Sequence, residues 1–121
     1  MKKILIVDDK SSISDLLTRF LSSKYEVEVR SDGIEAIMWL QEGNIPDLIL
    51  TDLQMPNMDG LELIGKVKNS GYFSDVPIIV LSSKDSSNDR ILCLKAGAED
   101  YIMKPFNPEE LLIRIEKVLG R

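Results

Sequence analysis

The sequence contains no histidine and only one cysteine among its 121 residues. Because a phosphohistidine needs an imidazole, the chain cannot act as a histidine kinase or as a histidine phosphotransfer module. The single thiol, Cys93, excludes an internal disulfide and a cysteine-based zinc cluster. Cys93 falls in an apolar helical pattern, which predicts a packed side chain, and the sparse use of cysteine indicates a reducing compartment.

Long apolar runs and an excess of basic residues are also lacking. The first apolar run covers only residues 4–7 and is shorter than the roughly 7 residues of an export signal. No other run approaches the length of a membrane span. With 20 acidic and 15 basic residues, the chain has no electrostatic basis for gripping a phosphate backbone. We therefore expect a cytoplasmic protein in which this segment binds neither membrane nor nucleic acid.

Apolar strand-like segments alternate with amphipathic helical segments along the chain. Continuous apolar runs predict strands buried on both faces, whereas the charged alternation over residues 26–30 predicts an edge strand. The expected strands cover residues 4–7, 26–30, 48–52, 77–82 and 101–103. The first helix is expected to bury one stripe formed by Ile13, Leu16, Leu17, Phe20 and Leu21.

Five strand and helix units without a linker or repeat indicate one α/β domain over residues 1–121. Right-handed crossovers between such strands give a doubly wound parallel sheet with helices on both faces. The charged second strand and the short fifth strand are expected at the two edges. This arrangement fits the flavodoxin-like (βα)5 order 2-1-3-4-5, in which the functional crevice lies over the first and third strands.

Acidic residues end the two strands that this order places side by side. Asp8 and Asp9 follow the first strand, and Asp52 ends the third. Like charges held this close need a cation or a proton, and oxygen ligands without histidine or thiolate favour magnesium. Two further strand ends add the Ser82 hydroxyl and the Lys104 ammonium, which suit a phosphoryl group. The negative charge of the three carboxylates is then balanced by the positive charges of one magnesium ion and Lys104.

Each of these residues also has a simpler interpretation. Asp52 could end its strand in solvent, and Asp9 could cap the first helix. Ser82 could cap the fourth helix, and Lys104 could be an ordinary solvated lysine. The coincidence of the right chemistry at four of five strand ends favours a common site.

Several motifs together resemble the response-regulator receiver domains of bacterial two-component signalling. They are Ile6-Val7-Asp8-Asp9, the run from Asp47 to Gly60 with Met55-Pro56, Leu81-Ser82-Ser83, Ala96-Gly97-Ala98 and Lys104-Pro105-Phe106. The resemblance implies that Asp52 accepts a phosphoryl group and that Asp8, Asp9, Asp52 and the Gln54 carbonyl hold magnesium. It also implies that Ser82 and Lys104 bind the phosphoryl oxygens and that the Lys104–Pro105 bond is cis.

The expected function is therefore a phosphorylation-activated signalling switch rather than an enzyme in the usual sense. A sensor histidine kinase or a histidine phosphotransfer protein would supply the phosphoryl group, and hydrolysis of the aspartyl phosphate would end the signal. The family usually meets its donor at the exposed face of the first helix, here Ser14, Asp15 and Thr18.

Two other classes of protein are alternatives. Phosphatases of the haloacid dehalogenase type carry a second aspartate two residues after the nucleophile, where this chain has Gln54, and the chain leaves no room for a cap domain. A pure interaction module that never turns over phosphate is the remaining alternative.

Position also suggests residues that tune and transmit the signal. Gln54 and Lys84 lie two residues beyond Asp52 and Ser82, so they are expected to flank the attacking water and to set the phosphoryl lifetime. Ser82 is expected to move toward the phosphoryl group, so that Tyr101 turns into the vacated space. The alternative for Tyr101 is a fixed aromatic at a sheet edge.

The C-terminal part is most similar to receivers of winged-helix transcriptional regulators, which pair through their fourth and fifth helices. The resemblance implies an activated homodimer in which Arg90 meets Glu110, and Glu99 or Asp100 meets Arg114. Lys95 and Glu116 would form a third pair with both signs inverted relative to the family. The sequence leaves open the cognate kinase, the output and whether an effector domain follows residue 121.

Overall fold

The computed structural model describes residues 1–83 and 87–120. Within them, five parallel strands form one sheet in the order β2-β1-β3-β4-β5, as predicted. The elements are β1 Lys3–Val7, α1 Ser11–Leu21, β2 Glu26–Arg30, α2 Gly33–Gln41, β3 Leu48–Thr51, α3 Gly60–Lys68, β4 Ile78–Ser82, α4 Ser87–Ala96, β5 Asp100–Met103 and α5 Pro108–Leu119. The doubly wound α/β fold is confirmed, with β2 and β5 at the edges.

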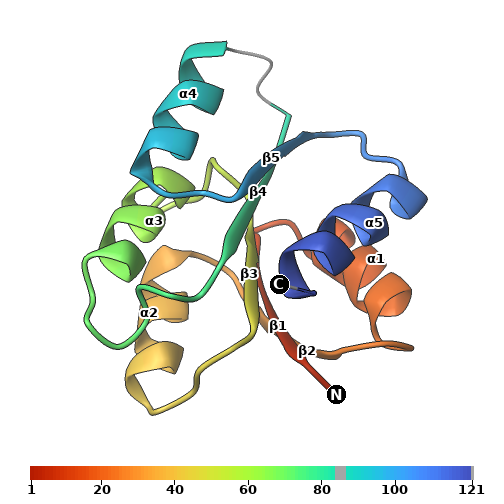
Figure 1. Cartoon of the computed structure of the whole chain (residues 1–121), viewed down its shortest axis with the longest axis horizontal. Helices are drawn as coiled ribbons and strands as arrows, with labels where there is room; N and C mark the ends of the chain where they lie inside the picture. Colours follow the sequence, from red (N-terminus) through yellow and green to blue (C-terminus); the bar gives the residue numbers. More distant parts are fainter. Residues whose placement is uncertain (84–86, 121) are drawn as a thin grey trace.

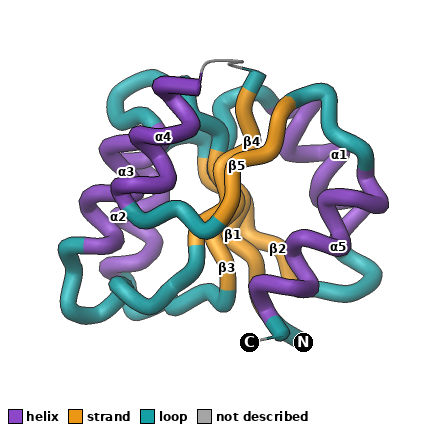
Figure 2. Tube along the Cα trace, turned by 45° about the horizontal axis from the view of Figure 1, so that its top comes forward, coloured by secondary structure: helices purple, strands orange, loops and turns teal. Residues whose placement is uncertain are grey.

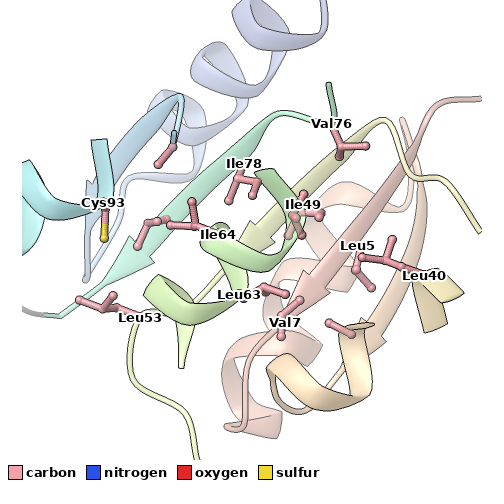
Figure 3. Packing of buried hydrophobic residues seen from close by; sticks show 14 of the residues in the cluster. Leu5, Val7, Leu40, Ile49, Leu53, Leu63, Ile64, Val76, Ile78 and Cys93 are labelled. Atoms are coloured by element: carbon pink, nitrogen blue, oxygen red, sulfur yellow. The ribbon is translucent and has the colours of Figure 1, made fainter. Parts of the chain in front are cut away.

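Helices α2, α3 and α4 cover one face of the sheet, and α1 and α5 cover the other (Figures 1 and 2). Alternate residues of the central strands point to opposite faces. Leu5 and Ile49 pack toward the three-helix side, and Figure 3 shows this cluster with Leu63 of α3 and Cys93 of α4. Burial raises the pKa of the Cys93 thiol, as expected for a packed cysteine.

Local sequence signals account for most helix ends. The carboxylates of Asp32 and Asp59 accept hydrogen bonds from the N–H groups of the first turns of α2 and α3. Asp59 and Glu62 form a reciprocal capping box. Gly43 has φ of 100°, a left-handed conformation suited to glycine just beyond α2. The two N-caps fix where the loops that follow β2 and β3 end.

Helix α1 excludes one simpler interpretation and differs from its predicted buried stripe. Its N-cap is Lys10, without a side-chain cap, so Asp9 does not cap this helix. Its buried face includes Ser14, whereas Leu16 is 52% exposed. The Ser14 hydroxyl donates to the Ser11 carbonyl within the helix, which lets a small polar side chain be buried. Ser14 was therefore wrongly assigned to the exposed face.

No helix in the described ranges is both long and apolar enough to cross a membrane.

Candidate functional site

The crevice over β1 and β3 brings the three predicted acids together. Parallel pairing places Val7 beside Thr51, and the Asp52 N–H donates to the Val7 carbonyl at 2.8 Å. Asp8 and Asp52 therefore leave neighbouring strands at the same level. Carboxylate oxygens of Asp8, Asp9 and Asp52 all lie within 4.8 Å of one another.

Lys104 reaches this cluster from the end of β5. Its Nζ lies 3.1 Å from Asp8 Oδ2 and 3.5 Å from Asp52 Oδ2. Its backbone N–H donates to the Ser82 carbonyl at 2.7 Å, and the Lys104–Pro105 bond is cis, as the resemblance implied. The side chain is only 12% exposed, so Lys104 is an integral part of the site and not an ordinary solvated lysine.

Asp52 is buried in a mostly acidic setting. Burial raises the pKa of its carboxyl, the Lys104 ammonium opposes that shift, and the Asp8 carboxylate adds to it. The Leu53 N–H donates to Asp52 Oδ1 at 2.8 Å and orients the side chain. Two buried acids, one exposed acid and the partly buried Lys104 leave excess negative charge. Hard oxygen ligands in this arrangement fit a divalent cation such as magnesium.

Ser82 at the end of β4 is buried, and its backbone carbonyl accepts the Lys104 N–H. It is the last residue of that strand and lies within the sheet, so it does not cap α4. Tyr101 on β5 is also buried, at 7% exposure. Burial raises the pKa of the Tyr101 hydroxyl, and a side-chain hydrogen bond with Ser82 opposes this. The Arg90 guanidinium carbon lies 5.7 Å from the centre of the Tyr101 ring.

The residues expected to tune the lifetime are placed only in part. Gln54 lies in the loop after β3, two residues from Asp52, with an exposed side chain. Lys84 lies outside the described residues. The role expected for Lys84 in setting the phosphoryl lifetime stays a prediction, as does that of Gln54.

Sequence reasoning missed a second lysine at the crevice. Lys10 Nζ lies 3.8 Å from Asp9 Oδ1 and 3.8 Å from Asp52 Oδ2. Its backbone N–H donates to Asp8 Oδ1 at 2.9 Å. The available signal was its position directly after two acids at a strand end.

A contact between two loops was also missed. The Asn57 side-chain amide donates to Asp32 Oδ2 at 2.8 Å, and the Gly33 N–H donates to the Met58 carbonyl at 3.1 Å. Asn57 itself has φ of 66°, a conformation that asparagine tolerates better than most residues. Gly60 is required here because an added Cβ would lie 2.4 Å from the Asp52 carbonyl oxygen. The loop after Asp52 is thus tied to the start of α2.

The residues proposed for dimer contacts lie on the surface of α4, β5 and α5. Arg90, Asp100, Glu110 and Arg114 line a cavity of about 530 Å³ that also includes Tyr101. Arg114 forms two ion pairs within the same chain. Its Nη1 lies 2.8 Å from Asp100 Oδ2, and its Nη2 lies 3.7 Å from Glu110 Oε1. These intramolecular pairs were not predicted.

The remaining three members of the proposed dimer surface are solvent-facing side chains: Lys95, Glu99 and Glu116. On α1, Asp15 is exposed and Thr18 is half-buried, so the predicted donor-facing surface retains these two residues.

Comparisons with known proteins assign this chain to one family. The sequence model of the response regulator receiver domain matches residues 4–116. The response regulator MprA of a Mycobacterium species (strain KMS) is 43% identical over 120 residues, covering 98% of this chain and 51% of that protein. This chain therefore spans about half the length of such curated relatives.

Solved structures agree with this result. A CheY-like receiver domain protein from Methanospirillum hungatei JF-1 is 35% identical with a TM-score of 0.91, covering 99% of this chain and 94% of that one. The receiver domain of a sensor histidine kinase from Pseudomonas aeruginosa PAO1 is 32% identical with a TM-score of 0.90, covering 99% and 98%. That structure is described with a magnesium ion coordinated in the active site cleft.

Proposed function

Because this chain belongs to the response regulator receiver domain family, we propose that it is a signalling switch activated by phosphorylation of Asp52. The observation that carries the proposal is the convergence of Asp8, Asp9 and Asp52 within 4.8 Å, with Lys104 contacting two of them. A sensor histidine kinase or a histidine phosphotransfer protein is the proposed donor. Asp15 and Thr18 on α1 are the proposed docking residues.

Asp52 is the proposed nucleophile. An ionised Asp52 oxygen attacks phosphorus, a P–O bond forms, and the P–N bond to the donor imidazole breaks. A carboxylate nucleophile needs no general base, so alignment and charge neutralisation carry the reaction. The Lys104 ammonium and the Ser82 hydroxyl are the proposed donors to the phosphoryl oxygens. Hydrolysis then returns the Asp52 carboxylate and releases inorganic phosphate, which ends the signal.

Magnesium is the proposed cofactor. The carboxylates of Asp8, Asp9 and Asp52 and the backbone carbonyl of Gln54 are the residues that would hold it. A bound ion would neutralise charge on the phosphoryl group during transfer. The magnesium described in the Pseudomonas neighbour supports this assignment.

Signal lifetime and output are assigned to residues around this centre. We assign Gln54 and Lys84 to control of water access, so that substitutions at both positions should change the rate of dephosphorylation. Ser82 and Tyr101 are the proposed coupling between the phosphoryl group and the α4, β5 and α5 surface. That surface is proposed to pair in an activated homodimer, and this domain is proposed to bind no nucleic acid.

Mass spectrometry after incubation with acetyl phosphate and magnesium tests the proposed function. The expected result is one added phosphoryl group that is absent from the Asp52→Asn variant. An interaction module would gain no phosphoryl group. A phosphatase of the dehalogenase type would instead hydrolyse added phosphomonoesters over many turnovers. Either result would overturn the proposal.

A further inference from the structure

Lys10 places a second ammonium group at the acidic crevice. Its Nζ lies 3.8 Å from both Asp9 Oδ1 and Asp52 Oδ2, so it spans an exposed and a buried carboxylate. Its backbone N–H donates to Asp8 Oδ1, which fixes the base of the side chain against the site. The side chain itself is 59% exposed. Lys10 is therefore anchored at its backbone, while its ammonium lies at the solvent side of the crevice.

Lys10 and Lys104 differ in how deeply the ammonium group lies in the crevice. Lys104 is 12% exposed and contacts Asp8 and Asp52 at shorter distances, 3.1 and 3.5 Å. Its charge is held inside the crevice. Lys10 lies at the solvent side of the crevice. Its ammonium can move from the carboxylates into water, so its charge stays solvated.

We infer that Lys10 is a displaceable counter-ion that competes with the divalent cation for Asp9 and Asp52. This inference rests on the proposed function, because these are two of the carboxylates assigned to magnesium. In metal-free protein the Lys10 ammonium offsets repulsion among the acids. When the cation is bound, Lys10 turns into solvent, because a positive charge beside a divalent ion is repelled.

The inference gives Lys10 two effects of opposite direction. Its charge stabilises the metal-free fold by reducing repulsion among the carboxylates. The same charge weakens cation binding, because it must be displaced. If Lys10 served only the fold, removing its charge would change the stability of the metal-free protein and leave the cation affinity unchanged.

The test compares wild type with Lys10→Gln, which removes the charge, and with Lys10→Arg, which retains it. Lys66→Gln is the matched control, because Lys66 is an exposed lysine in the last turn of α3 and its loss changes net charge equally. Magnesium affinity is measured by isothermal titration calorimetry at low ionic strength. The melting midpoint is measured in the presence of a chelator.

Lys10→Gln is expected to bind magnesium on the order of 3- to 10-fold more tightly than wild type. Without metal it is expected to melt ~1–3 °C lower. Raising the salt concentration should shrink the affinity difference. Lys10→Arg should behave like wild type, and Lys66→Gln should shift magnesium affinity by less than about 2-fold, because its charge is remote.

An affinity for Lys10→Gln equal to or weaker than that of wild type would overturn the competition and leave the proposed function standing. An equal gain in Lys66→Gln would also overturn it, because net charge alone would then explain the effect. If wild type binds no magnesium at all, both the competition and the proposed cofactor fail. The calorimetric readout does not require phosphotransfer, so these failures are distinguishable.

Discussion

The Asn57 amide donates a 2.8 Å hydrogen bond to the carboxylate of Asp32, which lies 25 residues earlier in the chain. Asp32 also caps α2 through the Glu35 N–H at 2.9 Å, so one buried carboxylate serves a helix and a loop. The loop in question runs from Asp52 to α3. Its conformation is therefore set partly by a residue outside the predicted site.

The first prediction concerns this contact. Asn57→Gly keeps access to the left-handed backbone conformation but removes the amide, so it is expected to destabilise the fold by about 1 kcal/mol. The free energy of unfolding from urea titration measures this. Asn44→Ala is the control, because Asn44 donates a comparable 2.8 Å bond to the Trp39 carbonyl at the other end of α2.

Amide hydrogen exchange separates a local effect from a general one. Asn57→Gly should speed exchange of the Met58 and Gly60 amides more than Asn44→Ala does. Equal exchange in the two variants would contradict the proposed role of the contact.

The second prediction uses the raised pKa of Asp52. Because the folded state holds a proton on this carboxyl more tightly than the unfolded state, ionised Asp52 destabilises the fold. That destabilisation appears as the pH rises from the ordinary carboxyl range through the raised pKa. At neutral pH and without metal, Asp52→Asn is expected to raise the melting midpoint by a few degrees, on the order of 2–5 °C. Lys104 keeps its partner Asp8 in this variant.

Asp15→Asn is the matched control, because Asp15 is exposed on α1 and loses the same charge. Its melting midpoint should change little. The advantage of Asp52→Asn should shrink as the pH falls toward the ordinary carboxyl range. A variant that is less stable than wild type at neutral pH would show that the Lys104 contact outweighs burial.

The third prediction is that magnesium stabilises the wild-type fold. A ligand that binds only the native state adds about 2.7 kcal/mol at 100 times its Kd, and here it also relieves repulsion among the acids. Thermal melts with and without magnesium measure this. Asp9→Asn should reduce the shift. An unchanged midpoint at saturating metal would argue against the metal assignment.

The fourth prediction concerns Tyr101, which is already buried beside Ser82 in this structure. Activation by beryllofluoride is expected to draw the Ser82 hydroxyl toward the acceptor site and to change the environment of the Tyr101 ring. Fluorotyrosine NMR reports this, with the 81% exposed Tyr72 as an internal reference. A Tyr101 signal that stays constant would support a fixed aromatic at the sheet edge.

The fifth prediction is activation-dependent dimerisation through α4, β5 and α5. Arg114 is already paired with Asp100 within the monomer, so the exposed residues Lys95 and Glu116 give the cleaner test. Lys95→Glu should weaken association by up to about 1 kcal/mol per contact, and adding Glu116→Lys should restore it. Light scattering with and without beryllofluoride measures association.

Two outcomes would count against the dimer. The activated protein could remain monomeric at high concentration, or the double variant could associate no better than Lys95→Glu alone. The second outcome would place Lys95 and Glu116 on an ordinary solvated surface.

The sequence alone determined the strand order, the edge strands and the identity of the acids at the strand ends. Apolar runs, alternating charges, helix caps and turn residues are local signals, and the strand order followed from fitting five such units to the flavodoxin-like arrangement. Asp8, Asp9, Asp52 and Lys104 follow from strand endings, since parallel strands deliver their carboxyl ends to one edge of the sheet. Their convergence in the structure agrees with that reasoning.

Tertiary structure decided which side chains meet across elements. Ser14 is buried and Leu16 is exposed because of how α1 is rotated about its own axis against the sheet. The apolar pattern of the helix fixes this rotation only approximately. The reach of Lys10 to Asp52, the bond between Asn57 and Asp32, and the pairing of Arg114 with Asp100 depend on side-chain direction after packing. Sequence spacing does not encode such directions, because each contact joins elements whose relative position only the packed core fixes.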